Sequence, residues 1–212
     1  MKPPIDLSLY LVTHRDSLLL EDFFRIILHS IEGGVKIVQL REKEASACEM
    51  ISIGKRLHML LKPFGIPLIV NDRVDVAHAI QADGVHLGQS DLSVAEARAI
   101  LGDDAIIGLS VETVEQVKAS SDQKVDYIAA SPVFSSKTKT DCYKPWGLEG
   151  LKQICTISTH PIIAIGGIDI TNVNAVLECG VSGVAVVSSI FNSPCPKTAA
   201  INLSKRIRQH AF

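Results

Sequence analysis

Paired cysteines, long apolar runs and an excess of either charge are all missing from this sequence, and each absence excludes a class of protein. The five cysteines are an odd number without a C-x-x-C pair, which argues against a disulfide framework or a zinc knuckle. The formal net charge of -2 lacks the basic excess of a nucleic-acid-binding protein. No apolar run approaches the roughly 20 residues that span a bilayer. We therefore expect binding to neither nucleic acid nor membrane, with any anionic ligand held by local groups.

The same reasoning bears on location and domain count. Pro3, Pro4 and Asp6 interrupt the stretch where a signal peptide would be continuously apolar, which predicts a cytoplasmic protein. A length of 212 residues suits one domain, and no Ser/Pro-rich linker divides the chain. We expect a single domain over residues 1–212. A homo-oligomer is left open.

Short β-branched runs alternate along the chain with longer stretches whose apolar residues recur every three or four positions. The runs that we expect to be strands are Leu7–Val12, Val35–Leu40, Pro67–Val70, Gly84–Leu87, Ile106–Leu109, Tyr127–Ala130, Pro161–Ile165 and Gly183–Val187. Several are too apolar for a sheet that faces water, which indicates parallel strands covered by helices. An open doubly wound sheet would usually have a Gly-rich turn after its first strand, and Tyr10–Asp16 has none. The pattern predicts a (β/α)8 TIM barrel, whose active site lies where the strands end.

A basic segment follows the second predicted strand. It reads Gln39-Leu40-Arg41-Glu42-Lys43, and alternation along an extended chain can project Gln39, Arg41 and Lys43 to one side. The fork of an arginine and the mobile charge of a lysine together suit a diphosphate. The alternative is a solvated loop in which neighbouring glutamates pair with these bases.

Two carboxylates are expected at the same rim, because Asp72 follows the third strand and Asp91 follows the fourth. Magnesium commonly binds one or two carboxylates and completes its octahedron with water and phosphate oxygens. The alternative is helix capping, since each aspartate precedes a helix. His86 lies within the fourth strand and is interpreted as a hydrogen-bonded core residue, not as a base.

Further polar groups follow the remaining strands. Ser110 ends the fifth strand and can either donate to a phosphate or cap the next helix. A long polar segment after the sixth strand offers hydroxyl groups and lysines, and could form a lid. Gly166-Gly167 and Val187-Ser188 follow the seventh and eighth strands, where barrels frequently bind phosphate.

With these residues assembled, the chain resembles thiamine phosphate synthase along nearly its whole length. The matching segments are residues 39–43, 71–73, 83–91, 132–139 and 166–167. The resemblance implies condensation of hydroxymethylpyrimidine diphosphate with hydroxyethylthiazole phosphate, or its carboxylated form, to give thiamine phosphate and pyrophosphate. It also implies Mg²⁺ as cofactor, bound by Asp72 and Asp91. We expect a magnesium-assisted dissociative substitution in which no protein side chain acts as the nucleophile.

The resemblance further assigns the two substrates to residues of this chain. The residues that it places around the pyrimidine diphosphate are Gln39, Leu40, Arg41, Glu42, Lys43, Asn71, Ser110 and Lys139. Those that it places around the thiazole phosphate are Ser136, Lys137, Thr138, Gly167, Val187 and Ser188. Of these, Arg41, Lys43, Ser110 and Lys139 are expected to be catalytic.

Two other functions are weighed against this one. Thiazole tautomerase shares the barrel, but where it carries a histidine acid/base this chain has Pro132, which cannot titrate. A noncatalytic sensor of a phosphorylated metabolite could use the same glycines without a metal. Ser131, where the family has a glycine, and Ser136, where threonine is common, also depart from the family pattern.

Overall fold

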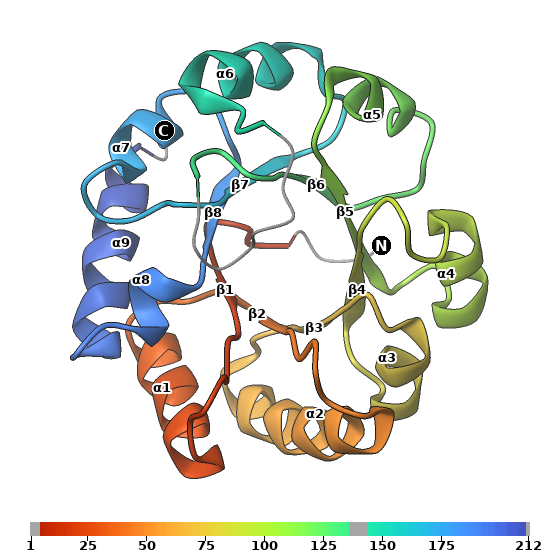
Figure 1. The fold of residues 1–212 in the computed structure, drawn as a ribbon, viewed down its shortest axis with the longest axis vertical. Coiled ribbons are helices and arrows are strands. Elements are labelled where there is room, and N and C mark those ends of the chain that lie inside the picture. The colour runs from red at the N-terminus through yellow and green to blue at the C-terminus, as the bar shows by residue number, and fades with distance from the viewer. Residues whose placement is uncertain (1–4, 136–143, 211–212) are drawn as a thin grey trace.

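Eight parallel strands close into one barrel in the computed structural model, which describes residues 5–135 and 144–210 (Figure 1). The strands are β1 (Leu9–Val12), β2 (Ile37–Leu40), β3 (Leu68–Asn71), β4 (Gly84–Leu87), β5 (Ile106–Val111), β6 (Tyr127–Ala130), β7 (Ile162–Ile165) and β8 (Gly183–Val186). Each strand pairs with the next in sequence, and β8 pairs with β1 to complete the closure. The predicted (β/α)8 barrel is thereby confirmed.

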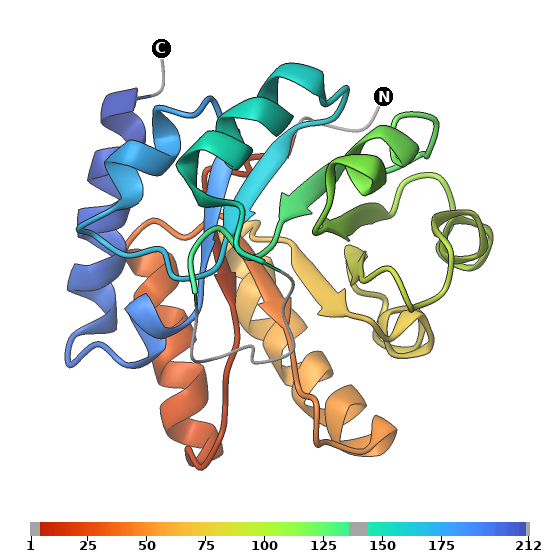
Figure 2. The same cartoon turned by 45° about the horizontal axis from the view of Figure 1, so that its top comes forward.

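Helices surround the barrel, as the tilted view shows (Figure 2). They are α1 (Leu20–Glu32), α2 (Ala47–Leu61), η1 (Lys62–Phe64), α3 (Val74–Ile80), α4 (Val94–Leu101), α5 (Val114–Ala119), α6 (Gly147–Ile157), α7 (Val173–Leu177), α8 (Ser188–Phe191) and α9 (Pro196–His210). Ser93 and Glu96 form a capping box at the start of α4, and Gly102 follows its last residue. Within the described residues, no helix is both long enough and apolar enough to cross a bilayer.

The alternation of side chains along each strand divides the buried apolar residues into two layers. One layer fills the space between strands and helices and includes Leu9, Leu11, Val38 and Leu40. The other lies inside the barrel. Because both faces of every strand are buried, the strands are apolar without a two-residue period.

Two strands run further than the sequence indicates. β3 continues to Asn71 and β5 continues to Val111, so Asn71 and Ser110 belong to the ladder itself. Both side chains are therefore held by strand pairing.

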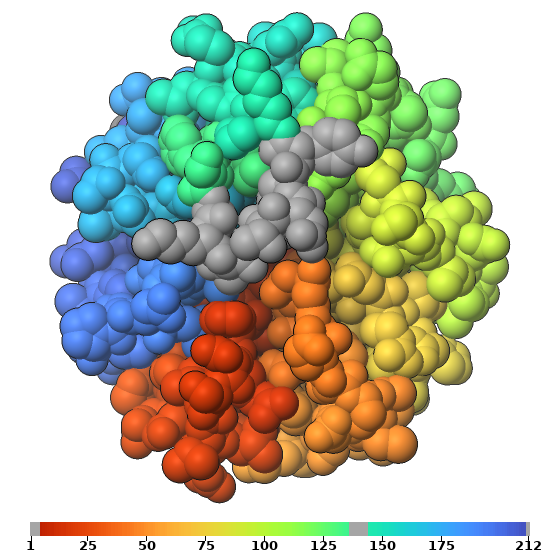
Figure 3. All heavy atoms as spheres, in the orientation of Figure 1, coloured from red at the N-terminus to blue at the C-terminus, as the bar shows by residue number. Residues whose placement is uncertain are grey.

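The N-terminal region, drawn in red, and the C-terminal region, drawn in blue, lie side by side on the surface (Figure 3), in agreement with the β1–β8 pairing.

Candidate active site

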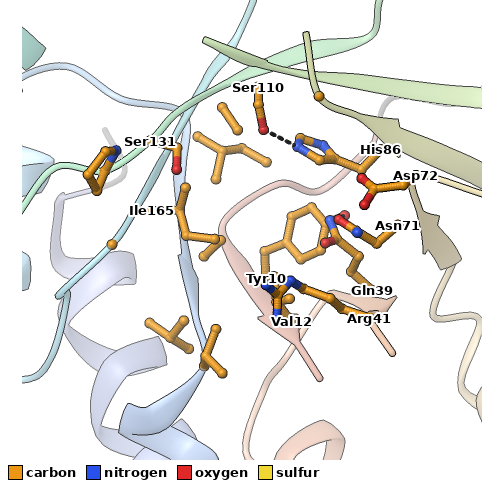
Figure 4. A pocket seen from close by; sticks show the side chains of 18 of the residues that line it. Tyr10, Val12, Gln39, Arg41, Asn71, Asp72, His86, Ser110, Ser131 and Ile165 are labelled. Atoms are coloured by element: carbon orange, nitrogen blue, oxygen red, sulfur yellow. Dashed lines mark hydrogen bonds between the residues drawn. The ribbon is translucent and has the colours of Figure 1, made fainter. Parts of the chain in front are cut away.

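A pocket opens at the carboxyl ends of the strands, and every βα unit contributes to it. The lining residues expected from the sequence are Gln39, Arg41, Lys43, Asn71, Asp72, Asp91, Ser110, Gly167, Val187 and Ser188. Figure 4 shows Gln39, Asn71 and Asp72 on one side of this pocket and Ser131 and Ile165 on the other. The barrel thus collects side chains that are far apart in the sequence.

The basic segment after β2 divides as strand alternation requires. Arg41 and Lys43 line the pocket, and the backbone N–H of Arg41 donates to Thr13 Oγ1 at 3.0 Å. Glu42 is turned toward Arg15, whose Nε donates to Glu42 Oε2 at 2.9 Å. Glu42 therefore does not neutralise the two pocket cations, which removes one of the two glutamates, Glu42 and Glu44, that the charged-loop alternative requires.

Leu40 and Glu42, expected near the pyrimidine diphosphate, are not among the residues that line the pocket. The Leu40 side chain is fully buried in the layer between the barrel and the helices. Its position follows from the two-residue alternation, because Gln39 and Arg41 point to the opposite face of β2.

Asp72 and Asp91 approach each other across the ends of β3 and β4. The backbone N–H of Asp72 donates to the His86 carbonyl at 2.8 Å, and Asp91 Oδ2 accepts from the Gly88 N–H at 2.6 Å. Neither aspartate caps a helix, because Arg73 stands at the N-cap of α3 and Ser93 at that of α4. The capping alternative therefore does not account for the two carboxylates.

The pKa of Asp72 reflects both its burial and the charges around it in the pocket. Its partial burial, and then the charge and hydrogen bond of neighbouring Asp91, raise its pKa from 3.8 to about 6. The positive charges of Arg41 and Lys43 act in the opposite direction and hold this rise in check. Two carboxyl groups and two positively charged side chains therefore interact electrostatically within one pocket.

This donor set fits a divalent cation. A cation between Asp72 and Asp91 would remove the repulsion that raises the Asp72 pKa. In the part of the chain that the structure describes, no group of three or more His, Cys, Asp or Glu side chains could surround a metal. Magnesium suits such a sparse site, because water and substrate oxygens can supply its remaining ligands.

Below the charged groups, a line of hydrogen bonds crosses the inside of the barrel. Gln39 Nε2 donates to the Tyr10 hydroxyl at 2.9 Å, and the hydroxyls of Tyr10 and Tyr127 lie 2.9 Å apart. His86 links Tyr127 to Ser110, with Nδ1 at 3.1 Å from the Tyr127 hydroxyl and Nε2 at 2.9 Å from Ser110 Oγ. The interpretation of His86 as a hydrogen-bonded core residue is confirmed. Ser110 is not a helix cap, since Thr113 caps α5.

Sequence reasoning did not identify Tyr10 and Tyr127 as lining residues. Both are almost completely buried in the barrel interior and border the pocket from below. The available signal was a tyrosine within an otherwise aliphatic strand, since a buried phenol hydroxyl normally needs a partner.

Glycine allows the chain after β7 to pass close to the segment after β6. Gly166 and Gly167 have φ angles of 108° and 65°, which side-chain-bearing residues rarely adopt. A Cβ on Gly166 would lie 2.7 Å from Pro132 Cβ, and one on Gly167 would lie 2.8 Å from Phe134 Cβ. Gly167 reaches the pocket beside Val187 and Ser188, where α8 begins.

Four expected site residues, Ser136, Lys137, Thr138 and Lys139, lie outside the described residues. Their assignments stay predictions.

A closed barrel with charged and polar groups around one pocket at its strand ends defines the class of (β/α)8 barrel enzymes that bind small anionic ligands. Comparison with known proteins makes this specific. The family model described as thiamine monophosphate synthase matches residues 9–190, so the chain belongs to that family.

Individual relatives support the same family assignment. A protein named thiamine-phosphate synthase from Albidiferax ferrireducens is 45% identical over 201 residues, which cover 95% of this chain and 92% of that protein. One of the same name from Desulfitobacterium hafniense is 44% identical over 199 residues, covering 94% and 96%. The solved structure of thiamine phosphate pyrophosphorylase from Pyrococcus furiosus superposes with a TM-score of 0.88 at 34% identity and covers 99% of both chains. The expectation of an enzyme of this family is confirmed.

Proposed function

We propose that this chain joins hydroxymethylpyrimidine diphosphate to hydroxyethylthiazole phosphate, releasing pyrophosphate and forming thiamine phosphate. The observation that carries the proposal is the pairing of Asp72 and Asp91 with Arg41 and Lys43 in the pocket of a barrel of this family. Cations beside a carboxylate pair suit a diphosphate that arrives with magnesium.

The substitution needs charge stabilisation more than it needs a nucleophile. The bond between the pyrimidine methylene carbon and the diphosphate oxygen breaks, and its electron pair leaves with pyrophosphate. The thiazole nitrogen then forms a new C–N bond to that carbon with its own lone pair. In this proposal Arg41, Lys43 and Lys139 neutralise the departing pyrophosphate, and Ser110 donates a hydrogen bond to the pyrimidine diphosphate.

Asp72 and Asp91 are the residues that would hold Mg²⁺. When bound, the ion supplies positive charge beside the leaving group. The barrel wall contributes by excluding water from the electron-poor carbon and by keeping the two substrates in line.

The thiazole phosphate is assigned to the opposite side of the pocket. Gly167, Val187 and Ser188 line it there, at the position where barrels commonly bind phosphate. Ser136, Lys137 and Thr138 are proposed to add hydroxyl and ammonium contacts from the segment after β6.

The test is to incubate the purified protein with both substrates and to measure pyrophosphate and thiamine phosphate, with Mg²⁺ and with excess EDTA. The proposal expects both products in equal amounts with Mg²⁺ and neither with EDTA. Isomerisation of the thiazole without pyrophosphate release would indicate the tautomerase. Binding without any reaction would indicate the sensor.

Two substitutions separate the proposed subsites. Lys139→Ala should mainly lower kcat, because the lysine stabilises charge that develops on the leaving group. Ser136→Ala should mainly raise the KM for thiazole phosphate. The reverse pattern, in steady-state titration of each substrate, would contradict the two assignments.

A further inference from the structure

The segment after β1 is joined by two side-chain contacts to the segment after β2, which carries the two pocket cations. Thr13 Oγ1 accepts a hydrogen bond of 3.0 Å from the backbone N–H of Arg41. Arg15 Nε donates to Glu42 Oε2 at 2.9 Å, and the two charged groups form an ion pair. The direction of both bonds is fixed, because a backbone N–H and a guanidinium can only donate.

These contacts lie behind the site and not in it. Thr13, Arg15 and Glu42 are not among the residues that line the pocket, so any effect that they have on a bound ligand passes through residues that do. Thr13 is fully buried, and its backbone N–H donates to the Gln39 carbonyl at 2.9 Å. Thr13 therefore continues the pairing of β1 with β2, and its side chain then holds the peptide of Arg41.

The ion pair fixes the direction in which Glu42 faces. The Glu42 side chain is only 7% exposed, and its Oε1 accepts no hydrogen bond from any residue that the structure describes. Without Arg15 this buried carboxylate would be uncompensated, which is strongly unfavourable. Arg41 and Lys43, the neighbours of Glu42 in sequence, both line the pocket. Because alternate side chains of an extended segment face opposite sides, holding Glu42 outward keeps both cations turned inward.

The segment is also held at its far end. Ser46 caps α2 and forms a capping box with Glu49. The hydrogen bonds from Ser46 lower the pKa of Glu49, and the positive charge of Arg15 lowers it further, so Arg15 lies near the start of α2 as well. Only three residues separate Glu42 from Ser46, and Lys43 is one of them. Lys43 therefore lies in a short span between two fixed points.

We propose that Thr13, Arg15 and Glu42 act as a clamp, a set of positioning residues that holds the two pocket cations where they bind a diphosphate. Figure 4 shows Arg41 among the side chains of the pocket. The inference deepens the proposed function, and its activity readout rests on that function. It gives Glu42 a role behind the site, in place of the direct contact with the pyrimidine diphosphate that the family resemblance implies.

Substitution of Glu42 separates positioning from charge alone, with inorganic pyrophosphate as the probe. Glu42→Met removes a negative charge near an anion site, so by Coulomb attraction alone pyrophosphate should bind more tightly. The clamp predicts the opposite, because Arg41 and Lys43 lose their fixed positions. The dissociation constant, measured by titration calorimetry with Mg²⁺, should rise by about tenfold, the effect of one charge-assisted hydrogen bond. Unchanged or tighter binding would refute the clamp.

Thr13 allows a closely matched comparison. Thr13→Val keeps the shape of the side chain but removes the acceptor for the Arg41 N–H, and should raise the same dissociation constant by about tenfold. Thr13→Ser keeps the hydroxyl and should stay within about threefold of wild type. On the background of Arg41→Ala, Thr13→Val should add no more than about threefold, because it acts through Arg41. Wild-type affinity in Thr13→Val, or a full tenfold loss added to Arg41→Ala, would contradict this role.

Glu32→Gln is the matched control, since it also removes one charge of an ion pair, with Lys197 at 2.9 Å, outside the pocket lining. It should leave pyrophosphate binding unchanged. Circular dichroism identifies any variant that does not fold, and the Glu42 and Thr13 substitutions decide the question independently of each other.

The same variants should lose kcat/KM for the pyrimidine diphosphate in parallel with their affinity for pyrophosphate. Failure of the proposed function alone would appear as a wild-type protein that binds pyrophosphate but forms no thiamine phosphate, in which calorimetry still tests the clamp. Failure of the clamp alone would appear as an active wild type whose affinity for pyrophosphate the Glu42 and Thr13 substitutions do not weaken. A wild type that binds no pyrophosphate would overturn both.

Discussion

Replacing Asp72 by asparagine should stabilise the metal-free protein at neutral pH, although it removes a proposed metal ligand. The Asp72 pKa is raised from 3.8 to about 6, chiefly by burial and then by Asp91. The folded protein therefore binds this proton more tightly than the unfolded chain does. The stabilisation that protonated Asp72 gives the folded state is present below about pH 4 and is lost as the pH rises through about 6. Above that pH the ionised Asp72 destabilises the fold.

The magnitude follows from the size of the shift. About 2 pH units correspond to at most about 3 kcal/mol, at roughly 1.4 kcal/mol per unit. Asp72 is only partly buried, so solvent screening reduces this to about 1–2 kcal/mol. For a domain of this size the melting temperature should rise by about 2–8 °C. Asparagine is the suitable substitution because Asp72 has a φ of 61°, which asparagine tolerates better than alanine.

The assay is urea unfolding of wild type and Asp72→Asn in EDTA, at pH 7.5 and at pH 4. The variant should be more stable at pH 7.5 and equal to wild type at pH 4, and added Mg²⁺ should stabilise wild type alone. Asp75→Asn is the matched control, since its hydrogen bond with Arg73 lowers the Asp75 pKa. That substitution should destabilise slightly at neutral pH. A variant at residue 72 that is no more stable than wild type at pH 7.5 would refute the reasoning.

Three further substitutions test other parts of the structure. Gly167→Ala forces a side-chain-bearing residue into a φ of 65°, and should raise the KM for thiazole phosphate by about tenfold or more; an unchanged KM would remove Gly167 from that subsite. Arg98→Lys should lower the free energy of unfolding by about 2–3 kcal/mol, because lysine cannot replace the guanidinium bonds to several backbone carbonyls and to Asp126. An unaltered urea midpoint would contradict this. Gly108→Ala should cost about 2 kcal/mol or more, since its Cβ overlaps Tyr127, and calorimetry showing a wild-type melting temperature would disprove the overlap.

The strands could be located from sequence because each is a short apolar run bounded by glycine or charged residues. Their ends shifted by one or two residues where ladder pairing continued past the apolar run, as at Asn71 on β3 and Val111 on β5. Local composition does not contain this information, since a ladder ends where the neighbouring strand stops offering partners.

The charged part of the site was accessible to the same reasoning, because Arg41 and Asp72 immediately follow strands whose ends must share a rim. The ion-pair partner of Glu42 could not be predicted from the sequence. Arg15 lies 27 residues earlier in the chain, and the parallel pairing of β1 with β2 brings it to the segment after β2.

The buried line of hydrogen bonds through Tyr10, Tyr127 and His86 could not be predicted for a different reason. In a strand buried on both faces, the sequence does not reveal which alternate residues face the barrel interior, so Tyr10 and Tyr127 could equally have packed against helices. The register of the strands decides which side chains face the barrel interior. Tyr10 is opposite Ile37 on β2 and Ala185 on β8, and all three belong to the interior layer.

The buried line of hydrogen bonds and the charged groups occupy different parts of this site. The members of this line lie on strands, where ladder hydrogen bonds fix the backbone, whereas Arg41, Lys43 and Asp91 lie beyond the strand ends. A buried polar network is stable only while every member is bonded, so loss of one hydroxyl leaves other groups unsatisfied. Substitutions in this hydrogen-bonded line should therefore alter stability and substrate affinity together. Substitutions among the charged groups should change turnover with smaller or even opposite effects on stability, as Asp72→Asn illustrates.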